Sequence, residues 1–171
     1  MIYPIVRWPE PILEREADDV ILFDTPHLHQ LIEDMFESMY AAKGVGLAAP
    51  QIGIGKKITV IDCAGGEGEP QRIVLINPTI IHKEGKQTGE EGCLSLPGFR
   101  EQVTRAKRAK VRARNANGDV FEMEGEDLLA RAFQHEIDHL MGRLFISHVS
   151  GLKRDLIKRK IKKLIKAGEW T

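Results

Sequence analysis

The sequence is poor in cysteine. Among 171 residues only Cys63 and Cys93 occur, too few for the disulfide framework of a small secreted protein. It has no apolar run of the length that spans a bilayer. Its first residues lack the basic start and apolar core of a signal peptide, and they show no transit peptide. These absences predict a protein of the reducing bacterial cytoplasm that has no membrane partner.

The chain also has no net charge, but its acidic and basic residues are unevenly distributed along the sequence. Residues 151–171 carry eight Lys or Arg and two Asp or Glu, whereas residues 1–150 carry 17 basic and 23 acidic side chains. Apolar residues make up 42% and charged residues 29%, the ordinary balance of a globular protein. We therefore expect one domain, with a catalytic body in residues 1–150 and a basic C-terminal helix in residues 151–171 appended to it.

Periodic apolar residues predict three helices. The first runs from Thr25 to Gly44, where apolar residues recur at helical spacing and a glycine ends the pattern. The second covers residues 127–141. The third begins after Ser150, a favourable N-cap, and reaches about Ala167.

Strands are expected mainly between the first two helices. The segments concerned are residues 57–61, 72–83, 102–115 and 120–123, with a break at Asn77-Pro78 and a hairpin turn at Asn117-Gly118. Residues 84–98 are Gly-rich and polar around one strand-like apolar island, Cys93–Leu96. This order predicts an α+β fold with mainly antiparallel β-sheets packed around a central helix, and with an amphipathic C-terminal helix.

The central helix contains Gln134-His-Glu-Ile-Asp-His-Leu140. His135 and His139 are four residues apart, so one face of the helix presents both imidazoles to a shared metal ion. Glu136 lies one residue round the helix, beside such an ion, where it suits a general base. A five-residue match also arises by chance on a solvated helix face, so the other segments must decide.

A catalytic metal takes three protein ligands and keeps one position open. Cys93, between Gly92 and Pro97, is the best third candidate, because its thiolate completes a His₂Cys set that suits a borderline-soft divalent ion. The alternative is an inert buried cysteine, the interpretation that we favour for Cys63. For the other four histidines we expect surface or structural roles.

The segment Gly44-Val-Gly-Leu-Ala-Ala-Pro-Gln-Ile-Gly53 is small and rich in turn-forming residues. No Gly-Lys-Ser/Thr follows, which argues against a phosphate-binding loop. Gln51 follows a proline, so its carboxamide can be fixed where acyl chemistry needs a donor to an oxyanion. The alternative is a turn that merely permits tight packing.

Three segments together resemble the peptide deformylase family. They are Gly44-Val-Gly-Leu-Ala-Ala-Pro-Gln-Ile-Gly53, Glu91-Gly-Cys-Leu-Ser95 and Gln134-His-Glu-Ile-Asp-His-Leu140. They occur in the family's order, and the similarity extends over about residues 5–148. One such motif is weak evidence, whereas three in register are specific, and no expected ligand or catalytic position departs from the family pattern.

The resemblance implies a metallo-amidase that hydrolyses the N-formyl group of formyl-methionyl nascent peptides and releases formate. It implies that Cys93, His135 and His139 hold the metal, which lowers the pKa of its water from about 15.7 toward 7. Glu136 then takes the proton from this water and delivers it to the departing amine.

The resemblance also implies the groups around the formyl oxygen and the peptide. The Gln51 amide and the backbone N–H of Leu94 stabilise the developing oxyanion. The substrate backbone pairs with an extended segment near Gly46. Glu91 and Arg100 resemble an ion pair on either side of the ligand loop, although two ordinary surface charges are the alternative.

The face of the central helix predicts the substrate pocket. Ala132 lies one turn before His135, and Leu128 lies another turn back. A small residue followed by a leucine leaves an apolar space that fits a methionine side chain, with Val45 as one wall.

The metal and the partners are less closely defined. Thiolate and imidazole ligands accept both Fe²⁺ and Zn²⁺. The resemblance implies Fe²⁺ as the physiological ion, and a purified sample can carry Zn²⁺, Ni²⁺ or Co²⁺ instead. We expect a monomer. The basic helix of residues 151–171 favours a polyanion, and our hypothesis is that it contacts the ribosome. A helix docked on the body with a solvated basic face is the plainer alternative.

Two other functions stay open on the sequence. A peptidase of the His-Glu-x-x-His type usually draws its third ligand from a downstream Glu or His, which the upstream Cys93 argues against. A non-enzymatic RNA- or ribosome-binding protein with a structural metal needs four protein ligands, and only three good ones are found.

Overall fold

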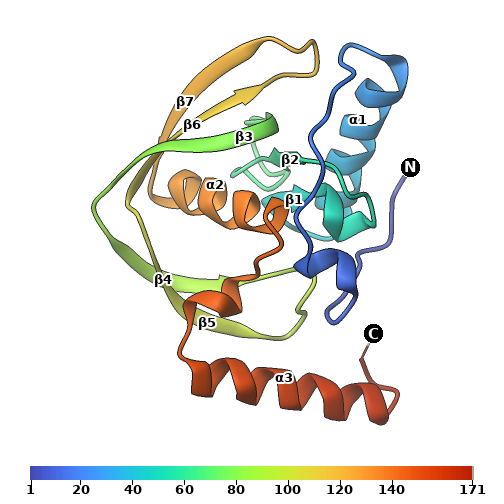
Figure 1. Cartoon of the computed structure of the whole chain (residues 1–171), viewed down its shortest axis with the longest axis vertical. Helices are drawn as coiled ribbons and strands as arrows, with labels where there is room; N and C mark the ends of the chain where they lie inside the picture. The colour runs from blue at the N-terminus through green and yellow to red at the C-terminus, as the bar shows by residue number, and fades with distance from the viewer. Residues whose placement is uncertain (171) are drawn as a thin grey trace.

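The computed structural model describes residues 1–170 and contains two antiparallel sheets with three long helices (Figure 1). The helices are α1 (Pro26–Ala41), α2 (Asp127–Leu140) and α3 (Gly151–Lys166), and the short 3₁₀ turns are η1 (Pro11–Glu14), η2 (Ala49–Ile52) and η3 (Phe145–His148). The predicted α+β class is confirmed. None of the helices in this part of the chain combines the length and the apolar character needed to cross a membrane.

The larger sheet has five strands in the order β1-β2-β3-β6-β7, and every neighbouring pair is antiparallel. Its strands are β1 (Gly46–Ala48), β2 (Ile58–Ile61), β3 (Ile73–Glu84), β6 (Arg108–Arg114) and β7 (Val120–Glu126). The smaller sheet pairs β4 (Gln87–Gly92) with β5 (Arg100–Arg105). In Figure 1 the chain passes between the sheets at the ends of β3 and β5.

Helix α2 lies between the two sheets (Figure 1). Its apolar face packs Ala130, Phe133 and Ile137 into a core with Leu75 and Val111 of the larger sheet. At the start of the helix, Gly125 approaches so closely that an added Cβ would lie 2.7 Å from the side chain of Leu129. Because α2 is covered on both sides, the residues that it carries are held in a fixed orientation.

Helices α1 and α3 lie at opposite ends of the molecule (Figure 1). The Thr25 side chain caps α1 by accepting from the N–H of Leu28, and the buried stripe of α1 forms a second core with β1 and β2. Ser150 caps α3 in the same way, through the N–H of Lys153. The buried Ile157 and Ile161 dock α3 on a third core near the smaller sheet.

Two strand predictions were wrong. The Asn77-Pro78 dipeptide does not end the strand, because β3 continues through it with a shift of register between Ile76 and Thr79. Asn77 takes a φ of 51° there, and its side chain pairs with both the N–H and the carbonyl of Val20 at 2.9 Å. A local hydrogen-bonded bulge has thus replaced the expected break.

The second error concerns residues 84–115. The apolar segment Cys93–Leu96 was expected to be strand-like, but it forms a turn that follows β4, which ends at Gly92. The single segment 102–115 is two strands, β5 and β6, which belong to different sheets. The predicted hairpin at Asn117-Gly118 is confirmed, since it joins β6 to β7.

Candidate metal and active site

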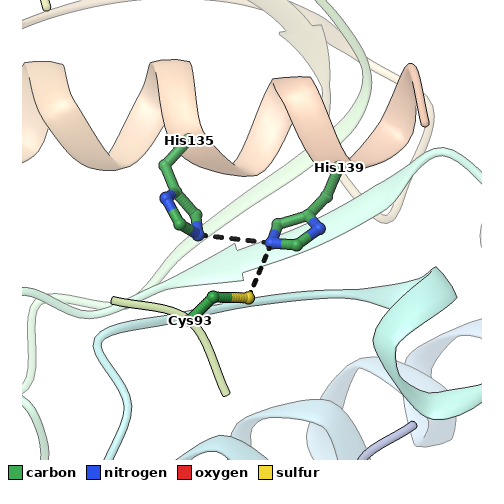
Figure 2. Close-up of side chains that lie close together, drawn as sticks. All are labelled: Cys93, His135 and His139. Carbon is green, nitrogen blue, oxygen red and sulfur yellow. Dashed lines mark hydrogen bonds between the residues drawn. The ribbon is translucent and has the colours of Figure 1, made fainter. Parts of the chain in front are cut away.

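Helix α2 presents two imidazoles to one point (Figure 2). His135 and His139 are one helical turn apart, and their Nε2 atoms are 3.2 Å from each other. The Sγ atom of Cys93 lies 3.3 Å from Nε2 of His139. The ligand atoms of all three residues lie within 4.8 Å of one another, so the structure brings the three predicted metal ligands together.

The sulfur is oriented by the loop that carries it. Directly after β4 the chain turns, with the N–H of Leu96 donating to the carbonyl of Cys93 at 3.0 Å. The Sγ atom then accepts from the N–H of Ser95 at 3.4 Å and from Nε2 of Gln51 at 3.5 Å. These two donors leave the sulfur facing the histidines.

This donor set fits a single divalent ion. Two ligands of one tetrahedral ion, at about 2.0–2.3 Å from it, lie roughly 3.3–3.7 Å apart, close to the separations found here. Burial and the neighbouring His135 lower the pKa of His139 well below its usual range, so its ring is held in the neutral form that can bind a metal ion. Burial also lowers the pKa of His135, but its bonds to Cys93 and Glu91 outweigh burial and raise the pKa to about 10. The site therefore favours a positive charge between these groups.

Glu91 fixes the ring of His135. The carboxylate accepts from Nδ1 of His135 at 2.9 Å, which leaves Nε2 directed at the other ligands. It is also held by Arg105, through two bonds of 2.9 Å, and by Arg131. Burial would raise the pKa of this carboxyl, but its bonds to Arg105 and His135 hold it well below its usual range.

The predicted ion pair between Glu91 and Arg100 is wrong. Arg100 instead pairs with the adjacent Glu90, at 2.8 Å on the surface. Alternation along β4 explains the difference, because Glu90 faces outward while Glu91 is 5% exposed. The buried partners Arg105 and Arg131 were missed. Their only signal in the sequence is that Arg105 shares the inward face of β5 with Val103.

Glu136 lies beside the ligands and is 5% exposed. Burial raises the pKa of its carboxyl to about 7, against the opposing attraction of His135. Its Oε1 atom is buried without a hydrogen-bond partner among the described residues. The other oxygen faces Gly46, where an added Cβ would lie only 2.5 Å from Oε2. A buried carboxyl with an unsatisfied oxygen and a pKa near neutrality suits proton transfer.

A cavity of about 750 Å³ opens in front of these groups. The residues that line it include Val45, Gly46, Gln51, Glu91, Cys93, Leu94, Leu128, His135 and Glu136. All three segments of the sequence thus meet at one cavity. Leu128 is 49% exposed on its wall, whereas Ala132 is 5% exposed, is not among the lining residues, and packs into the core with Phe133.

Comparison with known proteins identifies the family. The model of the polypeptide deformylase family matches residues 2–155. A peptide deformylase of Acidobacterium capsulatum is 60% identical over 170 residues, which is 99% of each chain. The crystal structure of a peptide deformylase from Legionella pneumophila is 44% identical with a TM-score of 0.89, over 100% of this chain and 99% of the other. That of Thermus thermophilus is 41% identical with a TM-score of 0.86, over 95% and 94%. The chain therefore belongs to the polypeptide deformylase family, the hydrolases that remove the N-formyl group from newly synthesised polypeptides.

Proposed function

We propose that the chain deformylates formyl-methionyl nascent peptides with an Fe²⁺ ion held by Cys93, His135 and His139. The observation that carries this assignment is the convergence of one thiolate and two imidazoles beside a buried carboxyl. When bound, such an ion acts as a Lewis acid that activates water and polarises the formyl carbonyl. Fe²⁺ rests on the family resemblance, and the same ligands also suit Zn²⁺, Ni²⁺ or Co²⁺.

Glu136 moves the proton in this proposal. Its carboxylate takes a proton from the attacking water and delivers it to the nitrogen of the departing methionine. Both steps need a group whose pKa lies near the working pH, and burial gives this carboxyl a pKa of about 7. The close approach of Gly46 keeps the carboxylate from swinging away from the ligands.

Gln51 and Leu94 bind the developing oxyanion. Oε1 of Gln51 accepts from the N–H of Ala48 at 3.0 Å, which fixes the amide so that Nε2 faces the site. The backbone N–H of Leu94 donates to no acceptor within residues 1–170 and lies on the cavity wall. Two fixed donors of this kind stabilise a tetrahedral intermediate more than the planar formamide.

The substrate peptide extends along β1. This strand is an edge of the larger sheet, so Gly46 has one side available for main-chain hydrogen bonds. The methionine side chain then enters the apolar part of the cavity, between Val45 and Leu128. Recognition of this kind reads little of the sequence beyond the first side chain, as an enzyme acting on many nascent chains requires.

We further propose a monomeric enzyme of the bacterial cytoplasm that contacts the ribosome. The body in residues 1–150 carries the chemistry, and the helix in residues 151–171 belongs to the same domain. Ile157 and Ile161 of α3 face the core. Apart from Lys153, which pairs with Glu101 at 3.3 Å, the lysine and arginine side chains of α3 form no ion pair within residues 1–170, so they are available to RNA phosphates. Removal of residues 153–171 should abolish co-sedimentation with ribosomes at low salt, and unchanged co-sedimentation contradicts this contact.

Anaerobic purification tests the central proposal. Metal content and activity are measured together, on formyl-Met-Ala-Ser and on the same peptide without the formyl group. We expect one Fe²⁺ per chain, activity in proportion to it, and release of formate from the formylated peptide alone. Cleavage of the unformylated peptide would indicate a peptidase instead.

A further inference from the structure

The charged side chains that line the active-site cavity do not balance. Glu90 is paired with Arg100, and Glu91 with Arg131, so both carboxylates are already neutralised on the cavity wall. Glu136, the third acidic residue of the lining, is buried beside the metal ligands. Two further cations, Arg7 and Lys43, also line the cavity, and neither forms an ion pair within residues 1–170. The outer part of the cavity therefore carries an excess of positive charge.

Arg7 is the more firmly placed of these two cations. The residue before it donates its N–H to the carbonyl of Gln51 at 2.7 Å, and Trp8 after it donates to the carbonyl of Ser95 at 3.0 Å. Its own carbonyl accepts from the N–H of Glu10 at 3.0 Å. Arg7 is thus fastened between the two segments that carry the oxyanion donor and the thiolate. Lys43, by contrast, is an exposed residue at the end of α1.

Within residues 1–170 the Arg7 side chain has no hydrogen-bond or ion-pair partner. Its Nε atom is buried without a hydrogen bond, and no ion pair joins its guanidinium to another described residue. The guanidinium of arginine presents several N–H donors in one plane, an arrangement that matches the two oxygens of a carboxylate. A half-buried guanidinium without an acceptor therefore has unsatisfied hydrogen-bond donors. A ligand that brings a carboxylate into the cavity supplies it.

We propose that Arg7 is a specificity-determining residue that binds an acidic side chain of the formylated peptide beyond the methionine. The inference rests on the proposed function, because the peptide must run from the metal ligands toward the cavity mouth. It adds a preference to a site that otherwise reads only the methionine. Formyl peptides with Asp or Glu near the amino terminus are then deformylated faster than matched neutral ones.

The test compares three peptides, formyl-Met-Ala-Asp-Ser, formyl-Met-Ala-Asn-Ser and formyl-Met-Ala-Lys-Ser, all with amidated C-termini. We expect kcat/KM to be about fivefold higher for the Asp peptide than for the Asn peptide, the upper range for a partly exposed ion pair. The difference should lie in KM and should shrink in high salt. Arg7→Gln should abolish the preference, so that kcat/KM for the Asp peptide falls to the value for the Asn peptide, and Arg7→Lys should keep part of it.

Arg143→Gln is the matched control, because Arg143 is exposed, outside the cavity lining, and has no side-chain partner within residues 1–170. It removes the same charge from the chain and should leave the preference intact. Equal kcat/KM for all three peptides, or equal effects of both arginine variants, would overturn the proposal. Arg7 also lines a second hollow beside Trp170, so a loss of thermal stability without a change in preference gives it a structural role instead. Failure to deformylate even the Asn peptide would contradict the proposed function itself, which separates the two.

Discussion

Gly46 and Glu136 approach each other more closely than any side chain at position 46 allows. A Cβ at Gly46 would lie 2.5 Å from Oε2 of Glu136 and 2.8 Å from its Cδ. Gly46 belongs to the edge strand of the larger sheet, and Glu136 to the helix between the sheets. The strand proposed to hold the substrate and the carboxyl proposed to move the proton are therefore set against each other by direct contact.

Gly46→Ala should displace this carboxyl. Because both the strand and the helix are buried, the new methyl group is accommodated mainly by rotation of the Glu136 side chain, and a displacement of this size costs about 100-fold in turnover. Gly55→Ala is the control, since a Cβ there meets nothing within 4 Å. Steady-state kinetics and metal content are measured for both. Normal turnover of Gly46→Ala would show that the position of Glu136 is not critical.

Glu136→Ala should keep the metal and lose nearly all turnover. The three ligand side chains do not depend on this carboxyl for a hydrogen bond, whereas proton transfer by a positioned group contributes about 10²–10⁴-fold. Metal analysis and deformylation of formyl-Met-Ala-Ser are the two measurements. A variant that turned over at close to the wild-type rate would remove Glu136 from its assigned role.

Gln51→Ala should slow the reaction without releasing the metal. Loss of one fixed donor to an oxyanion costs about 10²–10³-fold in kcat. Its amide also bonds Ser95 Oγ at 3.3 Å, so circular dichroism must confirm that the loop is intact. Unchanged kinetics in a folded, metal-loaded variant would exclude Gln51 from the oxyanion site.

The half-buried Tyr40 and the buried Asp62 form a pair whose stability contribution depends on pH. The hydroxyl donates to Oδ2 of Asp62 at 2.5 Å. Burial and this bond raise the pKa of Tyr40 to about 12. Burial opposes ionisation of Asp62, but the hydroxyl and two backbone N–H groups lower its pKa overall.

Tyr40→Phe should therefore cost about 1–2 kcal/mol of unfolding free energy at pH 7. Tyr40 has its raised pKa in the folded state, so its contribution is complete below about pH 10 and is lost as pH rises toward 12. Asp62 has a lowered pKa, so its contribution is lost below about pH 4. Urea unfolding at pH 3, 7 and 11 measures the difference between wild type and variant. A difference that stayed constant across this range would contradict the role of the pair.

Much of the site could be predicted from the sequence because its ligands follow local rules. The spacing of His135 and His139 is a property of any helix, and the turn-forming residues around Cys93 and Gln51 mark fixed loops. Ala132 shows the limit of such spacing. Three residues before His135 is about 60° round the helix, toward the core, whereas Leu128, seven residues before, is only about 20° away.

The features that the sequence did not predict depend on contacts between residues far apart in the chain. Strand β4 reads Gln-Thr-Gly-Glu-Glu-Gly, a composition of low strand propensity, and its pairing with β5 maintains it. Arg105 and Arg131 could not be distinguished among 25 basic residues, because their partner Glu91 is 14 and 40 residues away. Arg100 lies closer to Glu91 in the sequence than Arg105 or Arg131 does, and for that reason it appeared to be the better partner.

Glu91→Gln tests whether this buried carboxylate supports both the fold and the metal. The substitution leaves Arg105 and Arg131 without their shared counter-charge, and breaking a buried pair of this kind costs about 3–5 kcal/mol. It also weakens the bond that orients His135, which should lower metal affinity about 10–100-fold. Glu90→Gln is the control. Glu90 is adjacent to Glu91 in the sequence, but it pairs with Arg100 on the surface, where such an ion pair contributes less than about 1 kcal/mol. Urea unfolding measures the loss of stability, and metal titration measures the loss of affinity. Equal unfolding free energies and equal metal affinities in the two variants would show that the buried Glu91 supports neither the fold nor the metal site.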